Sequence, residues 1–337
     1  MNKIKVIIIG ILALTGTAFL LSSCEKKVLC DFPHPHDKHI CHTPLTFTFD
    51  TQWEEDIMQT YADKADIEKN SVQYIVEYWT LNEDNLPETL LEHTIYNGET
   101  WTEGENSITI DTYLPAMKVA ILCWAQPIAK NQDNNPNFNT ENLLQVSMNS
   151  LGATDLKDAF TASLSVDYTA YAHEYKGITL PAQTLKLQRP FGKYKVISND
   201  LETYFTQYGP NAELPATTQT NYSLWVSRQY NVYSQRSVNG ETNMNYTAIP
   251  KKLSEKHIQL NEDLIFIGTA DNTQNIYYLN ISSYNASGEL IHNSGSLTVG
   301  IQRNHTTLVY APALTEQAAD APTVDDSFDD EIIVEVP

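Results

Sequence analysis

The strongest constraint on the fold of this chain is an alternation of apolar and polar side chains with a period of two, which recurs in short segments along the sequence. This is the period expected of strands that bury a single face. Frequent Thr, Val and Ile, together with 19 tyrosines, also favour strands over helices. We therefore expect an all-β protein built mainly of antiparallel sheet. The alternating segments are residues 45–49, 72–79, 108–110, 119–124, 164–166, 222–226, 276–281 and 297–301.

Signals for helices are few. Residues 199–202 read Asn-Asp-Leu-Glu, in which a helix cap is followed three residues later by the acidic Glu202. The apolar side chains from Leu201 onward share one helical face, and Gly209 ends the pattern. We expect one short helix over residues 201–208 and a second over residues 141–148. Neither helix carries an obvious reactive group.

Two dipeptides, Asn97-Gly98 and Asn239-Gly240, lie between alternating segments. Both central residues of a type I′ turn have positive φ, which Asn and Gly tolerate better than other residues. We therefore expect a hairpin turn at each dipeptide.

The length of the chain predicts two domains. Its 337 residues exceed the roughly 250–300 residues at which a single hydrophobic core stops growing. A tyrosine-rich strand ends near Gly177, and a new β-prone run begins soon after it. The expected divisions are a signal peptide over residues 1–23, a Cys/His-rich tether over 24–44, an N-terminal sandwich over 45–178 and a C-terminal sandwich over 179–337.

The first residues have the order of a secretory signal peptide. Lys3 and Lys5 precede an uncharged run over residues 6–21, which is shorter than the roughly 20 residues that a membrane-spanning helix needs. The run ends in Leu-Ser-Ser-Cys, which resembles the lipobox of bacterial lipoproteins. That resemblance implies that Cys24 is acylated and becomes the mature N-terminus, so that lipid chains attach the protein to the outer membrane.

The charge of the chain argues against nucleic acid as a partner. The formal net charge is −21 at pH 7, and loss of the signal peptide with its two lysines makes the mature chain more acidic. Binding to phosphates needs clustered Lys and Arg, whereas the arginines are scattered. The acidity is typical of a soluble, self-repelling surface. The arginines are Arg189, Arg228, Arg236 and Arg303.

A cluster of cysteines and histidines follows the lipobox, and three interpretations of it stay open. Cys30 and Cys41 could close a disulfide loop, which suits an oxidising compartment and would restrict the unfolded chain by about 3 kcal/mol. The cluster could instead bind a metal, although its spacing is not that of a standard zinc site, or hold free thiols. We favour the disulfide and no metal. The weak candidate metal ligands are His34, His36, His39 and His42.

Short motifs for nucleophilic, metal-dependent, phosphate-binding or dinucleotide-binding enzymes do not occur in the sequence. We therefore expect a non-enzymatic protein without a cofactor. Cys123 lies in an apolar strand and is expected to be a small core residue. Exposed aromatic side chains could stack on sugar rings, so glycan binding is an alternative function, although aromatics more often fill sandwich cores. The aromatic candidates are Trp79, Trp101, Trp124, Trp225 and the tyrosines.

Several segments together resemble the fimbrillin-like proteins of Bacteroidota, in particular fimbrial anchor subunits and related domains of undefined function. The resemblance implies two tandem transthyretin-like β-sandwich domains, export as a lipoprotein, and a place in or beneath a surface fimbria. It covers most of the mature chain. The segments are the lipobox, the Cys-x(3)-His-Pro-His stretch from Cys30, residues 187–193 (Leu-Gln-Arg-Pro-Phe-Gly-Lys) and residues 302–307 (Gln-Arg-Asn-His-Thr-Thr).

The resemblance also implies how such subunits assemble. Stalk and tip subunits of the family lose their first strand to an arginine- or lysine-specific protease, and another subunit's C-terminal strand fills the groove. Here the first arginine is Arg189, so only lysines such as Lys64 or Lys69 could serve. This favours an untrimmed base subunit that stays tethered through Cys24.

The β-prone C-terminus follows a loose, acidic segment and could take part in that assembly. We expect residues 332–336 to act either as a donor strand for fimbrillin-like subunits or as the closing edge strand of the second domain. The apolar residues concerned are Ile332, Ile333, Val334 and Val336.

Overall fold

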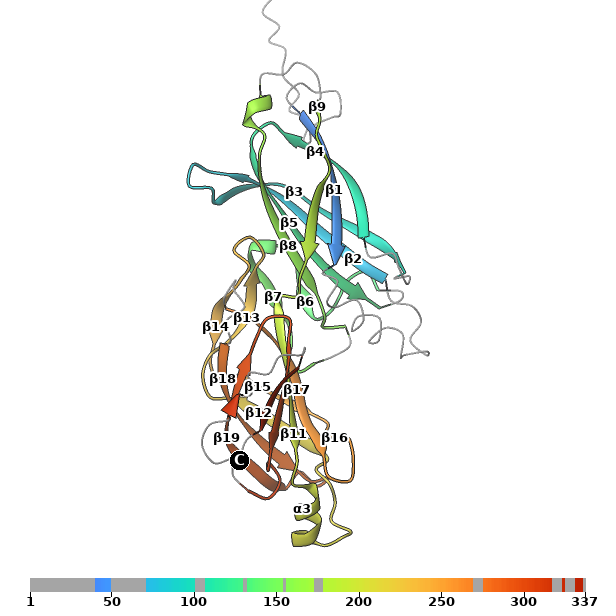
Figure 1. Cartoon of the computed structure of the whole chain (residues 1–337), viewed down its shortest axis with the longest axis vertical. Helices are drawn as coiled ribbons and strands as arrows, with labels where there is room; N and C mark the ends of the chain where they lie inside the picture. The colour runs from blue at the N-terminus through green and yellow to red at the C-terminus, as the bar shows by residue number, and fades with distance from the viewer. Residues whose placement is uncertain are drawn as a thin grey trace, which may run out of the picture.

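The computed structural model describes residues 40–49, 71–100, 107–129, 132–153, 156–172, 178–268, 275–316, 323–324 and 331–335. These residues form two β-sandwich lobes that lie end to end (Figure 1), with a single α-helix, α3 (Leu201–Tyr208), among them at the far end of the C-terminal lobe. The predicted all-β sandwich class and the helix at residues 201–208 are therefore confirmed.

The N-terminal lobe is a sandwich of two four-stranded sheets. One has the order β10-β1-β4, with β9 also paired to β1, and the other has the order β3-β2-β5-β8. Strand β1 lies inside its sheet, antiparallel to β4 and parallel to β9 and β10. The strands are β1 (Ile40–Phe49), β2 (Ser71–Leu81), β3 (Pro87–Thr100), β4 (Ser107–Pro115), β5 (Lys118–Ile128), β8 (Phe160–Asp167), β9 (Ile178–Thr179) and β10 (Gln183–Leu187). A short 3-10 helix, η3 (Thr169–Tyr171), follows β8.

Alternation explains how the N-terminal core forms. In β1 the side chains of Leu45 and Phe47 face inward and are fully buried, while the intervening Thr46 is half-buried and its hydroxyl contacts that of Thr109. Strand β5 is buried along both faces. Its odd-numbered side chains, including Cys123, enter the N-terminal core, as predicted for that cysteine, and its even-numbered ones face the opposite way.

The C-terminal lobe packs a six-stranded sheet against a four-stranded one. The first has the order β16-β17-β11-β20-β22-β21 and the second the order β15-β12-β18-β19. The buried core between them contains Tyr194, Leu260 and Val299, and α3 adds Leu201 and Tyr204. The strands are β11 (Phe191–Ser198), β12 (Thr217–Tyr222), β15 (Asn245–Ala248), β16 (Lys251–Lys252), β17 (Ile258–Phe266), β18 (Asn275–Tyr284), β19 (Leu290–Ile301), β20 (Thr306–Ala311), β21 (Thr323–Val324) and β22 (Glu331–Glu335).

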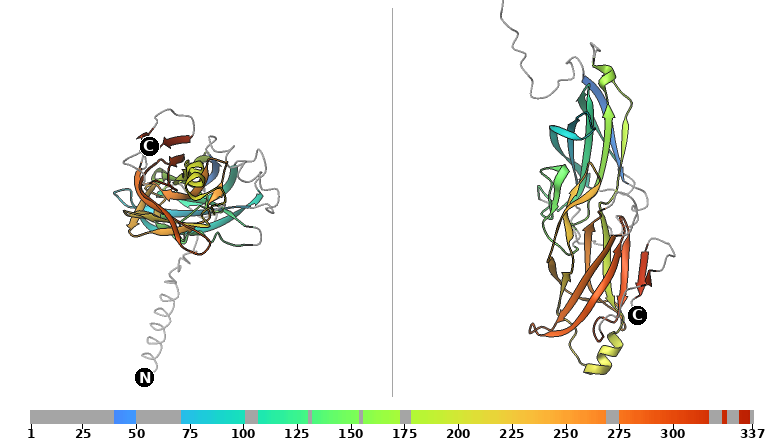
Figure 2. Two further views of the ribbon diagram at one scale, coloured as in Figure 1. Left: turned by 90° about the horizontal axis from the view of Figure 1, so that it is seen from below. Right: turned by 90° about the vertical axis from the view of Figure 1, so that its left-hand side faces the viewer.

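A fifth sheet joins the two lobes, which lie in line in Figure 2. Its order is β14-β13-β7-β6, so it combines strands from both halves of the chain. These strands enclose a third buried cluster, the junction cluster, whose aromatic rings pack edge-on or stacked. The strands are β6 (Phe138–Asn139), β7 (Val146–Met148), β13 (Val226–Asn231) and β14 (Arg236–Glu241). The junction cluster includes Trp124 of β5, Phe138 of β6, Tyr230 of β13, Phe191 of β11 and Phe266 of β17.

The pairing of strands crosses the domain boundary predicted at residues 178 and 179. Strands β9 and β10 belong mainly to the predicted second domain, yet they pair with β1 of the first. Strand β7 belongs to the predicted first domain, yet it pairs with β13 of the second. Strand β1 also begins at Ile40, inside the predicted tether.

Two local predictions were wrong. Residues 141–148 form a short 3-10 helix, η2 (Leu143–Gln145), followed by strand β7, because Val146 and Met148 are drawn into the junction cluster and pair with neighbouring strands. The hairpin dipeptides lie within strands β3 and β14 rather than between strands. The turn between β2 and β3 is instead made at residues 82–86, where Asn85 has the positive φ, 58°.

Candidate binding surface

Most of the predicted Cys/His cluster lies outside the described residues, as do Cys24 and Cys30. The two described members are both in β1. The Cys41 thiol faces the core and is 0% exposed, and burial raises its pKa. The His42 ring stacks on Tyr113 at 4.9 Å, and its Nε2 lies 2.9 Å from Oδ1 of Asp111. The disulfide therefore stays a prediction.

Within the described part of the chain, no group of three His, Cys, Asp or Glu side chains is placed to hold a metal ion. The weak metal candidates that precede β1, namely His34, His36 and His39, lie outside that part. Among the same described residues, no helix is both long and apolar enough to cross a membrane.

Of the C-terminal residues that we expected to donate or close an edge, Ile332, Ile333 and Val334 form part of β22, whereas Val336 lies outside the described residues. This strand lies along β20 in parallel, with Thr306 opposite Glu331 and Tyr310 opposite Glu335. The short strand β21 pairs antiparallel to its other side. Without β21 and β22 the sheet would end at β20, so this edge can accept an added strand.

The tryptophans that we considered for glycan binding differ in how far they are exposed to solvent. Trp124 is fully buried in the junction cluster, and Trp79 donates from Nε1 to the buried carboxylate of Glu77 at 2.8 Å. Trp101 lies outside the described residues. Trp225 is different, because 58% of it is exposed to solvent. It is therefore the one of the four whose observed position suits a ligand.

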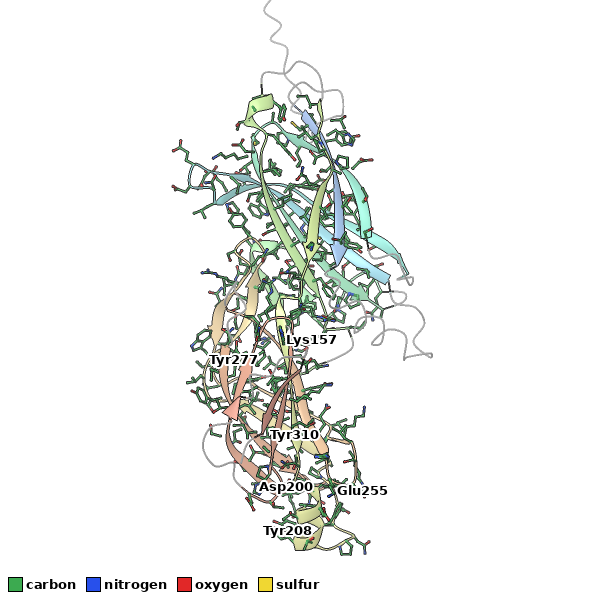
Figure 3. The ribbon with its side chains drawn as sticks, in the orientation of Figure 1. Lys157, Asp200, Tyr208, Glu255, Tyr277 and Tyr310 are labelled. Atoms are coloured by element: carbon green, nitrogen blue, oxygen red, sulfur yellow. The ribbon has the colours of Figure 1, made fainter. Side chains whose placement is uncertain are left out.

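Trp225 lies in a groove of about 260 Å³ on one side of the C-terminal lobe, the side marked by Tyr277 in Figure 3. Leu224, Ile276 and Tyr278 are also strongly exposed there. Exposed apolar groups that gather in one place mark binding surfaces more often than scattered ones do. The residues that line this Trp225 groove are Tyr222, Leu224, Trp225, Val226, Asn275, Ile276, Tyr277 and Tyr278.

Local structure holds the indole in place. Trp225 lies in the connection between β12 and β13, directly before the first residue of β13, and its ring lies over Gly240 of the neighbouring β14. A Cβ on Gly240 would lie only 2.2 Å from Cε3 of Trp225, so a larger residue at this position would push the ring away. The glycine that we had assigned to a hairpin turn therefore makes room for an exposed aromatic ring.

The other wall of the Trp225 groove comes from β18. Alternation along this strand turns Ile276 and Tyr278 outward, whereas Tyr277 and Leu279 turn toward the core. Burial raises the pKa of Tyr277 to about 12 and that of Tyr222 well above its ordinary value, so both hydroxyls stay neutral at pH 7. All eight lining residues are uncharged. The groove thus suits a neutral ligand with an apolar face.

The size of the Trp225 groove limits what it can enclose. Pockets for drug-sized ligands are usually about 300–1,000 Å³, and this groove is smaller, at about 260 Å³. It could therefore hold one ring of a longer molecule. Its described lining lacks the paired nucleophile and base, or the paired carboxylates, that hydrolysis requires.

Comparison with known proteins gives one family and several distant structures. A family described as a family of unknown function (DUF6562) matches residues 37–337. This match fits the part of our prediction that named related domains of undefined function. No curated protein matches the sequence.

The solved structures that resemble this chain have low sequence identity. The fimbrial anchor protein Mfa2 from Porphyromonas gingivalis is 11% identical, with a TM-score of 0.42 over 75% of this chain and 81% of its own. A candidate polysaccharide-binding protein from Bacteroides thetaiotaomicron is 10% identical, with a TM-score of 0.42 over 75% of this chain and 79% of its own. A candidate adhesin from Bacteroides ovatus is 11% identical, with a TM-score of 0.40 over 93% of this chain and 96% of its own.

Proposed function

The chain belongs to the family of unknown function DUF6562, and on that premise we propose that it is a non-enzymatic, lipid-anchored cell-surface protein that serves as an anchor or minor subunit of a fimbria-like structure. The sequence supports export and acylation at Cys24 through its signal peptide and lipobox. The structure supports a role in assembly through its two sandwich lobes and through β20, which would become a sheet edge if β21 and β22 left it.

The single observation that carries the assembly role is the place of β22. A C-terminal strand that pairs next to the last strand of its sheet, beside only the two-residue strand β21, can be exchanged for the same strand of another subunit. Edge pairing of this kind supplies backbone hydrogen bonds for affinity. Strand β20 offers five paired positions to it, from Thr306 to Tyr310.

Deletion of residues 331–337 tests this role. Loss of fimbrial assembly with an unchanged melting temperature would support strand donation, whereas loss of folding would show that β22 is only a closing edge strand. A matched control changes Lys251 and Lys252 to Glu in β16, at the opposite edge of the same sheet. This control should assemble normally.

The place of β1 supports an untrimmed base subunit. Protease trimming would have to cut after β1, and Lys64 and Lys69 are the lysines that follow it before β2. Because β1 is an internal strand with fully buried Leu45 and Phe47, its loss would expose the N-terminal core. Mass spectrometry of the mature protein should therefore recover a peptide that runs uncut through both lysines. Recovery of a new N-terminus after Lys64 or Lys69 would contradict the anchor role.

Affinity capture of the native lipoprotein from its own outer membrane, followed by mass spectrometry, identifies the partner. Recovery of fimbrillin-like subunits would support assembly. Recovery of glycan-uptake proteins alone, or of nothing, would reject the anchor role.

A second candidate function is glycan binding, and the Trp225 groove is the specific observation that favours it. An exposed indole beside Tyr278, with an uncharged lining, can stack on the apolar face of a sugar ring. Trp225→Ala should then abolish retention on a neutral polysaccharide, while the matched control Trp79→Phe should not. Equal retention of both variants and the wild type, or retention of none, would exclude a glycan site here.

A further inference from the structure

A buried ion pair lies near the level where the two lobes meet. Lys157 belongs to the connection between β7 and β8, and Asp263 belongs to β17 (Figure 3 labels Lys157). The Lys157 ammonium lies 3.0 Å from Oδ1 of Asp263, and both side chains are 0% exposed. Nζ of Lys157 also donates to the carbonyl oxygen of Gly152 at 2.8 Å.

Such a pair is costly as a salt bridge. Removing two charges from water costs several kcal/mol per ion, and the attraction between them often does no more than offset this cost. Replacement of a buried pair by apolar groups is frequently neutral or stabilising. A covalent bond between the two groups would remove both charges and keep the link.

The surroundings of the Asp263 carboxyl group are those of a reaction site. The backbone N–H of Leu264 donates to Oδ1 at 2.8 Å, and the hydroxyl of Tyr222 donates to Oδ2 at 2.9 Å. One oxygen thus has a donor suited to a developing oxyanion, and the other has a donor suited to a leaving hydroxyl. We propose that Lys157 and Asp263 condense to an intramolecular isopeptide bond that ties the interlobe connection to β17.

The step balances within the pair. The ammonium group gives one proton to the carboxylate, which leaves a neutral amine beside a carboxylic acid. Nζ then attacks Cγ, and the N–C bond forms while Leu264 N–H stabilises the negative charge on Oδ1. The nitrogen then gives up a second proton, the Tyr222 hydroxyl passes that proton on to the already protonated Oδ2, and the C–Oδ2 bond breaks as Oδ2 leaves with both protons as water. One amide and one water result, and no oxidant or outside reactant is needed.

The environment keeps each group in the form that the step requires. Burial lowers the pKa of Lys157, with Asp263 opposing this effect, so the neutral amine is more accessible than in water. Burial also raises the pKa of Tyr222 well above its ordinary value, so its hydroxyl keeps the proton that it relays. The Tyr194 hydroxyl lies 2.8 Å from that of Tyr222 and holds it in position. The fold holds the amine and the carboxyl group in contact. The reaction therefore avoids the entropy cost of bringing the two groups together, which is a large part of the activation free energy.

The bond is readily tested on the full mature chain as it is produced in its own cells. The chain is denatured and digested, and the peptides that contain Lys157 and Asp263 are measured by mass spectrometry. The proposal expects one branched peptide that joins both residues and weighs one water less than the two separate peptides. Recovery of only the separate peptides, with unmodified Lys157, would overturn it.

Variants test the roles of the surrounding groups. Lys157→Met and Asp263→Leu remove the charges together and should yield a folded chain without the branched peptide. Tyr222→Phe should slow its formation by roughly 10²–10⁴-fold, the usual contribution of a general acid. The matched control Tyr230→Phe removes the hydroxyl of a buried tyrosine in the junction cluster, outside this site, and should still form the bond at the wild-type rate. A wild-type rate in Tyr222→Phe would overturn the assigned proton relay.

Discussion

At the scale of single residues, Asp200 shows how one carboxylate can fix two elements. It occupies the N-cap position of α3, but its side chain makes no cap hydrogen bond. It accepts instead from the backbone N–H groups of Leu314 and Thr315, at 3.0 and 2.7 Å, in the segment that follows β20. The residue therefore joins the start of α3 to the end of the sheet.

Asp200→Ala should lower the free energy of unfolding by about 3 kcal/mol, because it leaves buried N–H donors without a partner. Urea unfolding measures the change. Glu202→Ala, on the same helix and exposed, is the control and should change stability by less than about 0.5 kcal/mol. Equal effects of both variants would mean that the contacts to residues 314 and 315 contribute nothing.

Gly240→Val should displace the indole of Trp225 without unfolding the lobe, because the added atoms would occupy the space of the ring. The expected result is a shift in tryptophan fluorescence and a loss of any ligand that binds the Trp225 groove. The neighbouring variant Glu241→Val should leave the emission unchanged. An unchanged spectrum for Gly240→Val would show that the glycine does not control the ring.

At the scale of elements, β1 is both the nearest described strand to the predicted anchor and an internal strand of its sheet. Phe47→Ala should lower the free energy of unfolding by about 3–5 kcal/mol, the range for a buried phenylalanine. Thr46→Ala on the outer face should lower it far less. Thermal unfolding of the two variants compares them. Similar melting temperatures would contradict the internal position of β1.

The alternation of side chains predicted the strands well, because the period of two depends only on which face is buried. It did not predict their partners. Strand β7 pairs with β13, some 80 residues later, and the sequence of residues 146–148 does not indicate this partner. The dipeptide Asn239-Gly240 has the turn chemistry that we expected, including the positive φ of Asn239, yet tertiary packing places it within a strand.

The candidate sites were less predictable than the strands. Trp225 was among our aromatic candidates, but its exposure depends on Gly240 and β18, which come together only in the fold. Lys157 and Asp263 are separated by more than 100 residues, and neither stands out in the sequence. The burial of the Lys157 ammonium group depends on strands that are distant in the sequence, so the sequence alone does not predict it.

At the scale of the whole molecule, buried tyrosines make the fold sensitive to alkali. Burial raises the pKa of Tyr230 and of Tyr277 from 10.0 to about 12. Since the folded state holds these protons more tightly than the unfolded state, the stabilisation is complete below pH 10 and is lost as the pH rises toward 12. Tyrosinate absorbance and circular dichroism should therefore change together in that window. Titration well before unfolding would contradict this.

The junction cluster should make the two lobes unfold as one unit. Trp124→Ala removes the largest side chain at the junction and should lower the free energy of unfolding by about 3–5 kcal/mol. Because the lobes then lose their coupling, the single calorimetric unfolding transition should separate into two. Trp225→Ala, at an exposed position, should leave a single transition. Two transitions in the wild type would mean that the cluster does not couple the lobes.

The sheet shared by β6, β7, β13 and β14 also affects how such a protein could be inherited or engineered. A gene cut between the lobes would separate β7 from β13 and uncover the outer face of β5. Recombination that exchanges one lobe for that of a relative would have to carry the matching strands with it. We expect natural variation in this family to preserve the junction as one inherited block, while loops at the two far ends diverge freely.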